Sequence, residues 1–262
     1  IVDFEKVMEY PLAAVPLSIC NADGTMRKTN KSDLAKSILS NATNEKMPET
    51  SLINIIYIVD LMALVRTIQQ IPDTFEDLAF RIVKAIPASY KGVDIVSNSY
   101  HKNSIKSGER KKRASFEKVI VKSSQSKVPR ELGKSISNNE NKQNMIEVLI
   151  DAIVEKRSKK LNLLRTSTLV LSGDEVCKMI TVAGVENFTE LISTQEEADT
   201  KIILHSHQAL VNCKNNHVLL RSPTADTDIL VLAIALLHEF KEEVVLDNGT
   251  GNSRQLIWMG CF

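Results

Sequence analysis

The chain has 262 residues, of which 43% are hydrophobic and 25% charged, and its formal net charge is +1. These values are typical of an ordinary soluble globular protein with one large or two small domains. The longest apolar run, Ile229 to Leu237, is far too short to span a bilayer, so we expect no membrane segment. The sequence begins at Ile1 without a signal peptide and stops at Phe262 without a closing element, which predicts a fragment.

The N-terminal half predicts an extension followed by the start of a folded core. Residues 1–50 carry two short apolar stretches and a polar linker, and we expect the core to occupy residues 51–262. The β-branched run from Ile53 to Val59 predicts a buried strand that ends on Asp60. Helical spacing and a second strand follow in chain order: helices at 61–70 and 74–86, with Asp73 or Thr74 as N-cap, and a strand at 93–96.

The C-terminal half continues the alternation of strands and helices. The predicted elements are helix 144–154, strand 168–171, helix 196–210, strand 218–221, helix 229–240 and strands 244–247 and 255–258. The last two strands are joined through Asn248-Gly249, which favours a β-hairpin over a phosphate-binding loop. Alternating strands and helices predict an α/β fold with a mostly parallel central sheet, helices on both faces and a C-terminal hairpin.

The cysteines and histidines offer a weaker hypothesis. The four cysteines are scattered, without a CxxC pair: Cys20, Cys177, Cys213 and Cys261. This pattern fits free thiols in a reducing compartment. A zinc site can be drawn from His205, His207, Cys213 and His217. Their spacing is not that of a standard zinc motif, so polar residues on a helix and its following loop are the favoured interpretation.

Two clusters of carboxylates near the C-terminus are the most informative feature of the sequence. The first is Glu196-Glu197-Ala198-Asp199, and the second is Asp226-Thr227-Asp228, which lies between two apolar runs. Like charges repel, and an unpaired buried carboxylate is costly, so divalent cations with oxygen ligands are the usual relief. Acids in a first helical turn also complement the helix dipole, which is the structural alternative for the first cluster. The two clusters predict a metal site for phosphate chemistry.

Further polar residues follow the predicted strands. Asp60 and Asn98 come at or after the ends of the first two strands. Parallel sheets bind ligands at the carboxyl ends of their strands. We therefore expect five acids to meet at one sheet edge within about 8 Å, a spread set by a two-metal site: Asp60, Glu197, Asp199, Asp226 and Asp228.

In this order and spacing, residues 53–240 resemble the flap endonuclease/XPG group of the PIN-like nucleases. The matching motifs are IYIVD ending at Asp60, Glu197-Ala198-Asp199 and Asp226-Thr227-Asp228. The chain more closely resembles uncharacterised, often invertebrate proteins with an EEADT segment and a DTD segment, for which we expect an association with mobile elements. Residues 1–50 match only that set. The family's second Asp is Asn98 here, and its last Asp would lie beyond the end of the sequence.

The resemblance implies hydrolysis of phosphodiesters in DNA or RNA with two Mg²⁺ or Mn²⁺ ions, about 4 Å apart. It implies Asp60, Glu197 and Asp199 as ligands of the first ion, and Asp226 and Asp228 as ligands of the second. Lys106 and Arg113 match the family's residues that neutralise the scissile phosphate. Asn98 would be a degenerate metal position that impairs cleavage, in which case Asn98→Asp would raise it.

A basic segment lies between the second strand and the helix at 144–154. Eleven Lys and Arg oppose three Glu between Lys102 and Lys134, and we treat residues 101–143 as a basic insertion. Such a stripe suits a polyphosphate backbone. The candidate contacts are Arg110, Lys111, Lys112, Lys118 and Lys122. The segment has few aromatics, which predicts weak sequence preference, and Arg110–Arg113 can alternatively be a nuclear localisation signal.

The sequence is compatible with three functions. The first is a metal-dependent, structure-specific nuclease with an intracellular, nuclear location. The second is a catalytically inactive relative that binds nucleic acid or scaffolds a complex, which Asn98 favours. The third is an unrelated phosphohydrolase or phosphotransferase that uses the same acids. The sequence has no P-loop and no Ser/His/Asp order that stands out, so ATPase and serine hydrolase functions are disfavoured.

Overall fold

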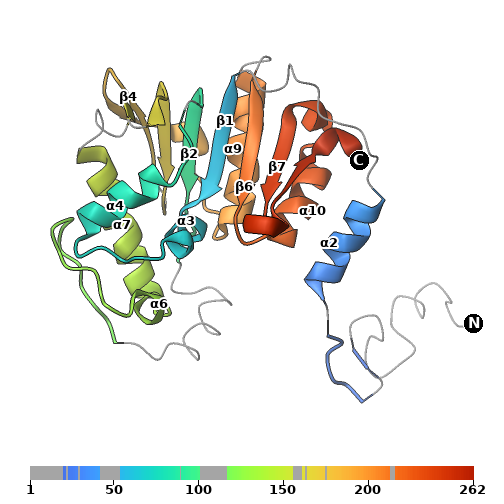
Figure 1. Cartoon of the computed structure of the whole chain (residues 1–262), viewed down its shortest axis with the longest axis horizontal. Coiled ribbons are helices and arrows are strands. Elements are labelled where there is room, and N and C mark those ends of the chain that lie inside the picture. Colours follow the sequence, from blue (N-terminus) through green and yellow to red (C-terminus); the bar gives the residue numbers. More distant parts are fainter. Residues whose placement is uncertain are drawn as a thin grey trace, which may run out of the picture. The chain divides into compact units, whose positions relative to one another are not determined.

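A computed structural model describes most of the chain (Figure 1). The described residues are 20–21, 23–28, 30–41, 54–88, 90–100, 117–155, 161–162, 164–174, 176–212 and 216–262. The chain divides into two compact units, Ile1–Asn41 and Ala42–Phe262. The first unit contains helix α2 (Lys31–Ser40), whose N-cap Asn30 accepts a hydrogen bond from the backbone N–H of Ser32. Within the described ranges, none of the helices has the length and hydropathy of a membrane span.

The described part of the second unit forms an eight-stranded sheet in the order β5-β4-β3-β2-β1-β6-β7-β8. Its strands are β1 (Ile55–Asp60), β2 (Gly92–Val96), β3 (Thr168–Ser172), β4 (Cys177–Thr181), β5 (Val185–Asn187), β6 (His217–Ser222), β7 (Val244–Asn248) and β8 (Gln255–Trp258). The central strands β3, β2, β1, β6 and β7 are parallel, and β4, β5 and β8 pair antiparallel at the two ends. The predicted α/β class, the mostly parallel sheet and the C-terminal hairpin are therefore confirmed.

Alternation along the central strands puts one large apolar core on the first face of the sheet. Tyr57 and Val59 point to this face, because successive side chains of a strand point to opposite sides. The helices that cover it are α3 (Leu61–Thr67), α4 (Phe75–Lys84) and α7 (Asn139–Glu155). Helix α4 packs directly against α7, and its N-cap is Thr74, one of the two residues that the sequence predicted.

The second face of the sheet is covered by helices α9 (Ala198–Asn212) and α10 (Thr227–Leu236). Helix α9 contacts β1, β2 and β6, and α10 packs beside α9. A smaller core on this face contains Val170, Cys177 and Leu191, with Leu204 of α9 packed against it. The two faces together bury the continuous apolar runs of the central strands, as parallel sheets require.

Several elements differ from the sequence-based prediction at their bounds. Helix α7 begins at Asn139 rather than at 144, and α9 begins at Ala198, so Glu196 and Glu197 precede the helix. Helix α10 ends at Leu236, and a 3-10 segment, His238–Glu243, replaces the rest of the predicted helix. Strands β4 and β5 and the short helix α6 (Leu132–Ser135) were not predicted.

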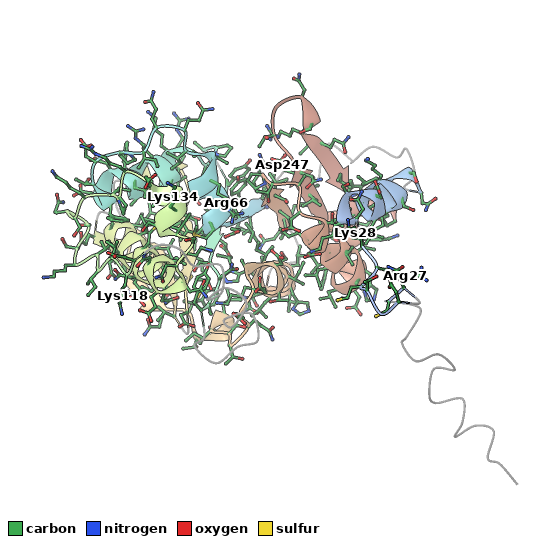
Figure 2. The ribbon with its side chains drawn as sticks, turned by 90° about the horizontal axis from the view of Figure 1, so that it is seen from below. Arg27, Lys28, Arg66, Lys118, Lys134 and Asp247 are labelled. Carbon is green, nitrogen blue, oxygen red and sulfur yellow. The ribbon has the colours of Figure 1, made fainter. Side chains whose placement is uncertain are left out.

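The β7–β8 hairpin closes through a turn that needs glycine. Gly249 has φ +80°, and a Cβ on this residue would lie 2.7 Å from the carbonyl oxygen of Ser253. Asp247 of β7, labelled in Figure 2, is buried. It accepts two hydrogen bonds from Arg254, at 2.7 and 2.8 Å. The Asn248-Gly249 segment is therefore a hairpin turn, as the sequence predicted, and the buried carboxylate is satisfied by a guanidinium.

Candidate metal centre

The order of the strands creates a switch point between β1 and β6. From β1 the chain builds the sheet outward through β2 and β3, and it then returns with β6 on the other side of β1. In open α/β sheets the crevice at the carboxyl ends of such strands is the usual ligand site. Asp60 ends β1 and Asp226 follows β6, so both acids lie at this crevice. Figure 1 shows β1 running down into α3 at this lower edge of the sheet.

Asp60 is both the last residue of β1 and the N-cap of α3. Its Oδ1 accepts a hydrogen bond of 2.7 Å from the backbone N–H of Met62. The pKa of Asp60 is raised to about 6, mainly by loss of hydration and in a smaller part by the charge of Asp226. The Met62 N–H and the charge of Arg66 oppose this rise. Asp60 is therefore a partly buried acid whose charge interacts with the second cluster across the switch point.

The second cluster is built by a tight turn after β6. The amide N–H of Asp226 donates to Ser222 Oγ at 2.9 Å, and Asp226 Oδ1 accepts from the Asp228 N–H at 3.0 Å. Asp226 is thus the N-cap of α10, and Asp228 lies in its first turn. Ala225, between the strand and this cap, has φ +53°, a left-handed conformation that is uncommon for a residue with a side chain.

Asp199 completes an acidic triad from the first turn of α9. Carboxylate oxygens of Asp199, Asp226 and Asp228 all lie within 4.8 Å of one another, and all three residues are partly buried. Loss of hydration, together with the charges of Asp226, Asp60, Asp228 and Glu197, raises the pKa of Asp199 to about 7. Burial and repulsion thus disfavour the ionised triad in the absence of a cation.

Glu197 and Asn98 border the triad in different ways. The charge of Glu197 contributes to the raised pKa of Asp199, so this acid lies near Asp199, although it is not part of the triad. Asn98 Oδ1 instead accepts a hydrogen bond of 2.5 Å from the backbone N–H of Ala198. The side-chain oxygen at the predicted degenerate metal position therefore accepts a hydrogen bond from the start of α9.

The predicted basic contacts are only partly within the described residues. Lys106, Arg110, Lys111, Lys112 and Arg113 lie outside them. Lys118 forms an ion pair of 2.6 Å with Glu140 of α7, and Lys122 is exposed. Figure 2 shows Lys118 over the part of the molecule that contains α7. The charge of Lys118 is thus partly neutralised by α7.

Sequence reasoning missed a cation at the switch point. Arg66, labelled in Figure 2, lies in the last turn of α3 and is exposed. It acts electrostatically on Asp60. Arg66 could have been identified from its position on the helix that Asp60 caps. A cation six residues after an N-cap lies within about two helical turns of the capping residue.

The other polar groups do not extend the centre. His205 is buried and its Nδ1 lies 2.8 Å from Asp94 Oδ2, an internal pair on the second face of the sheet. Among the described residues, the acid triad alone has the spacing of a metal site. His205, His207 and His217, from which the disfavoured zinc site could be drawn, do not form such a group there, and Cys213 lies outside the described residues.

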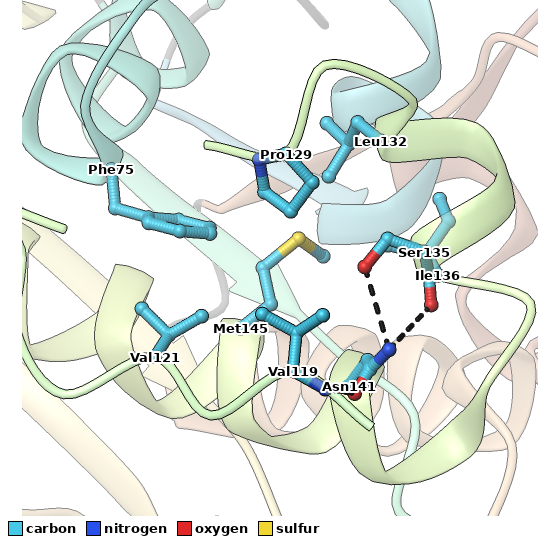
Figure 3. Close-up of a pocket in the computed structure, with 9 residues that line it drawn as sticks. All are labelled: Phe75, Val119, Val121, Pro129, Leu132, Ser135, Ile136, Asn141 and Met145. Carbon is cyan, nitrogen blue, oxygen red and sulfur yellow. Dashed lines mark hydrogen bonds between the residues drawn. The ribbon is translucent and has the colours of Figure 1, made fainter. Parts of the chain in front are cut away.

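A small pocket beside α4, α6 and α7 is also distinct from the centre. Apolar side chains such as Phe75 and Met145 form most of its lining (Figure 3). Its amide residue, Asn141, already donates to the backbone and Oγ of Ser135 and accepts from the Val119 N–H. The lining contains no charged side chain, so it offers no acid–base or metal chemistry.

The triad at the switch point offers a dense set of oxygen ligands. Carboxylates in this number suit hard divalent ions such as Mg²⁺ or Mn²⁺. Comparison with known proteins assigns no family: no family model matches the chain, and neither a curated protein nor a solved structure matches it.

Proposed function

We propose that the protein hydrolyses phosphodiesters of nucleic acid with a divalent metal ion held at the switch point. The observation that carries this proposal is the triad of Asp199, Asp226 and Asp228, whose carboxylate oxygens lie within 4.8 Å of one another. The triad comes from two helix starts at the carboxyl edge of a parallel sheet, where α/β proteins bind phosphate ligands.

The electrostatics of the triad support a cation as its partner. Three acids at this distance repel each other when ionised, and the pKa of Asp199 is raised to about 7 by burial and by its acidic neighbours. A bound divalent ion would remove this cost. The ligand set contains only oxygen atoms, which favours Mg²⁺ or Mn²⁺ over zinc.

Some residues of this chain would bind the metal ion, and others would bind the substrate. Asp199, Asp226 and Asp228 would hold the ion, with Asp60 and Glu197 at its border. A bound Mg²⁺ supplies Lewis-acid stabilisation of phosphoryl oxygens and a more acidic water.

Cations of the chain would hold the substrate in this scheme. Arg66 is exposed and acts electrostatically on Asp60, and it would orient a phosphate of the nucleic-acid backbone toward the triad. Lys106 and Arg113 remain the proposed residues that neutralise the scissile phosphate. The basic segment would carry the remaining contacts with DNA or RNA.

A second candidate function is binding of nucleic acid without cleavage. Asn98 favours it, because an amide stands where the resembled nucleases have a carboxylate, and its oxygen is engaged by Ala198. A nuclear location and an association with mobile elements belong to either version of the proposal. They rest on the Arg110–Arg113 run and on the EEADT and DTD segments of the sequence.

Cleavage assays with the full-length protein separate the two candidates. Flap, hairpin and single-stranded DNA and RNA are incubated with Mg²⁺, with Mn²⁺ or with EDTA. The nuclease proposal expects metal-dependent cleavage that Asp199→Asn abolishes, while the matched variant Asp94→Asn, outside the triad, retains it. Metal-independent binding without cleavage in any condition would favour the second candidate.

A further inference from the structure

The start of α9 is hydrogen-bonded to the segment that follows β2. Asn98 Oδ1 accepts from the Ala198 N–H at 2.5 Å, and the Ser99 N–H donates to the Glu196 carbonyl oxygen at 2.8 Å. These two bonds run in opposite directions between the same two segments. The first satisfies a helix N-terminal N–H that has no partner within α9. The side chain of Asn98 thus caps a helix that lies a hundred residues further along the chain.

Lys201 makes a third connection between the same elements. Its Nζ donates to Ser99 Oγ and to the Gly173 carbonyl oxygen, both at 2.7 Å. The side chain is 1% exposed, and Ser99 is fully buried. A buried ammonium is tolerated only when it is well bonded, so these two bonds fix the first turn of α9 against the ends of β2 and β3.

Asp199 and Lys201 leave α9 in nearly opposite directions. Two residues along an α-helix turn the side chain by about 200°. The contacts agree with this geometry, because Lys201 reaches the strand ends while Asp199 reaches Asp226 and Asp228. The hydrogen bonds of Lys201, on the side of this turn that faces β2 and β3, therefore hold the backbone that carries Asp199 on the opposite side.

We propose that Asn98, Ser99 and Lys201 form a latch that positions Asp199 for metal binding, and that Asn98 is a positioning residue instead of a degenerate metal ligand. The latch deepens the proposed function and rests on it, since Asp199 matters only where the triad binds a cation. Groups that orient metal ligands from behind typically account for a 10- to 100-fold difference in affinity when they are removed.

Asn98 gives the sharpest test, because two substitutions separate the two roles. Mn²⁺ affinity is measured by titration of the full chain with Mn²⁺ alone, followed by electron paramagnetic resonance. Asn98→Ala removes the cap acceptor and should weaken Mn²⁺ binding about tenfold. Asn98→Asp keeps an acceptor for the Ala198 N–H and should bind Mn²⁺ within about threefold of wild type, less than the loss expected for a disrupted latch.

A matched control separates the latch from general loss of a helix cap. Thr74 caps α4 with its side chain, away from α9, so Thr74→Ala should leave Mn²⁺ affinity unchanged. Lys201→Met, which removes the ammonium but keeps most of the stem, should weaken Mn²⁺ binding as Asn98→Ala does. Amide hydrogen exchange in EDTA should be faster at residues 198–201 in Asn98→Ala and unchanged there in Thr74→Ala.

The outcomes distinguish this inference from the proposed function. Equal Mn²⁺ affinity of wild type and Asn98→Ala, or tenfold tighter binding by Asn98→Asp, would overturn the positioning role alone. Unchanged exchange at residues 198–201 in Asn98→Ala would overturn the latch whatever the metal result. A wild-type chain that binds no Mn²⁺ would contradict the proposed function, and the positioning role with it.

Discussion

Asp199 and Asp226 start two different helices, α9 and α10, and bring their carboxylate oxygens within 4.8 Å of each other. Each acid is individually well placed, because a helix N-terminus favours negative charge. Their ionised forms repel each other, and Asp226 is the strongest of the acidic neighbours that raise the pKa of Asp199. This conflict between local stabilisation and mutual repulsion is the physical basis for expecting a cation between them.

Asp226→Asn tests the charge of the triad without removing a helix cap. The Asn side chain keeps the oxygen that accepts from the Asp228 N–H, so α10 should stay intact. We expect Mn²⁺ affinity to fall at least about tenfold, because an ionised ligand is lost. In EDTA the free energy of unfolding should stay equal or rise, since repulsion is relieved; urea denaturation measures this. A fall of Mn²⁺ affinity and of stability in parallel would point to a structural role only.

Asp94→Asn should show the opposite pattern. Asp94 is buried and pairs with His205 at 2.8 Å on the face of the sheet that α9 covers. The substitution weakens this internal bond and should lower the free energy of unfolding by about 1–3 kcal/mol. Mn²⁺ affinity, measured below the unfolding transition, should match wild type. A large loss of Mn²⁺ affinity in this variant would mean that the centre extends to Asp94.

The stability of the metal-free protein should fall as pH rises through the pKa values of two acids. Asp60 and Asp199 have pKa values of about 6 and 7 in the folded protein, above the value of about 3.9 in an unfolded chain. A raised folded-state pKa means that the folded state holds the proton more tightly. The stabilisation that these acids give is therefore complete below about pH 4 and is lost as pH rises through 6 and 7.

Urea unfolding in EDTA at pH 5, 6.5 and 8 measures this dependence. Asp199→Asn should flatten the decline between about pH 4 and 7, and Mg²⁺ should raise the melting temperature more at pH 8 than at pH 5. A stability that rises steadily with pH in EDTA, with no effect of Asp199→Asn, would contradict the expected repulsion within the triad.

Binding of nucleic acid should depend on salt through the basic segment. Replacing Arg110, Lys111 and Lys112 with Ala should lower affinity for DNA or RNA similarly across sequences. If each contacts one phosphate of a duplex, the slope of log affinity against log salt should become less steep by about three. Fluorescence anisotropy between 50 and 200 mM salt measures the slope. An unchanged slope in this triple variant would exclude these residues from the interface.

The fold was largely predictable because its strands carry strong local signals. The run before Asp60 is apolar and mostly β-branched, and the run before Arg221 is apolar. Both form central strands within one or two residues of the predicted bounds. The edge strand β5, Val185–Asn187, carries no such signal, because it is short and exposed. It forms only because β4 offers a partner, which a local pattern cannot reveal.

The candidate site was partly predictable for a similar reason. The acids of the two clusters are close in sequence to helix starts, so topology alone places them at one edge of a parallel sheet. The contacts of Asn98 and Lys201 were not predictable, because they join segments about a hundred residues apart. The sequence assigned Asn98 from its family position, whereas its observed partner depends on where α9 begins.

The most direct test of the account is a calorimetric titration of the full-length protein with Mg²⁺ or Mn²⁺, followed by cleavage of a flap DNA substrate in the same buffer. We predict saturable metal binding that Asp226→Asn weakens at least about tenfold, and cleavage that requires the metal and is lost in the same variant. Binding and cleavage that are equal in wild type and Asp226→Asn, or no metal binding by wild type at pH 8, would contradict the central claim.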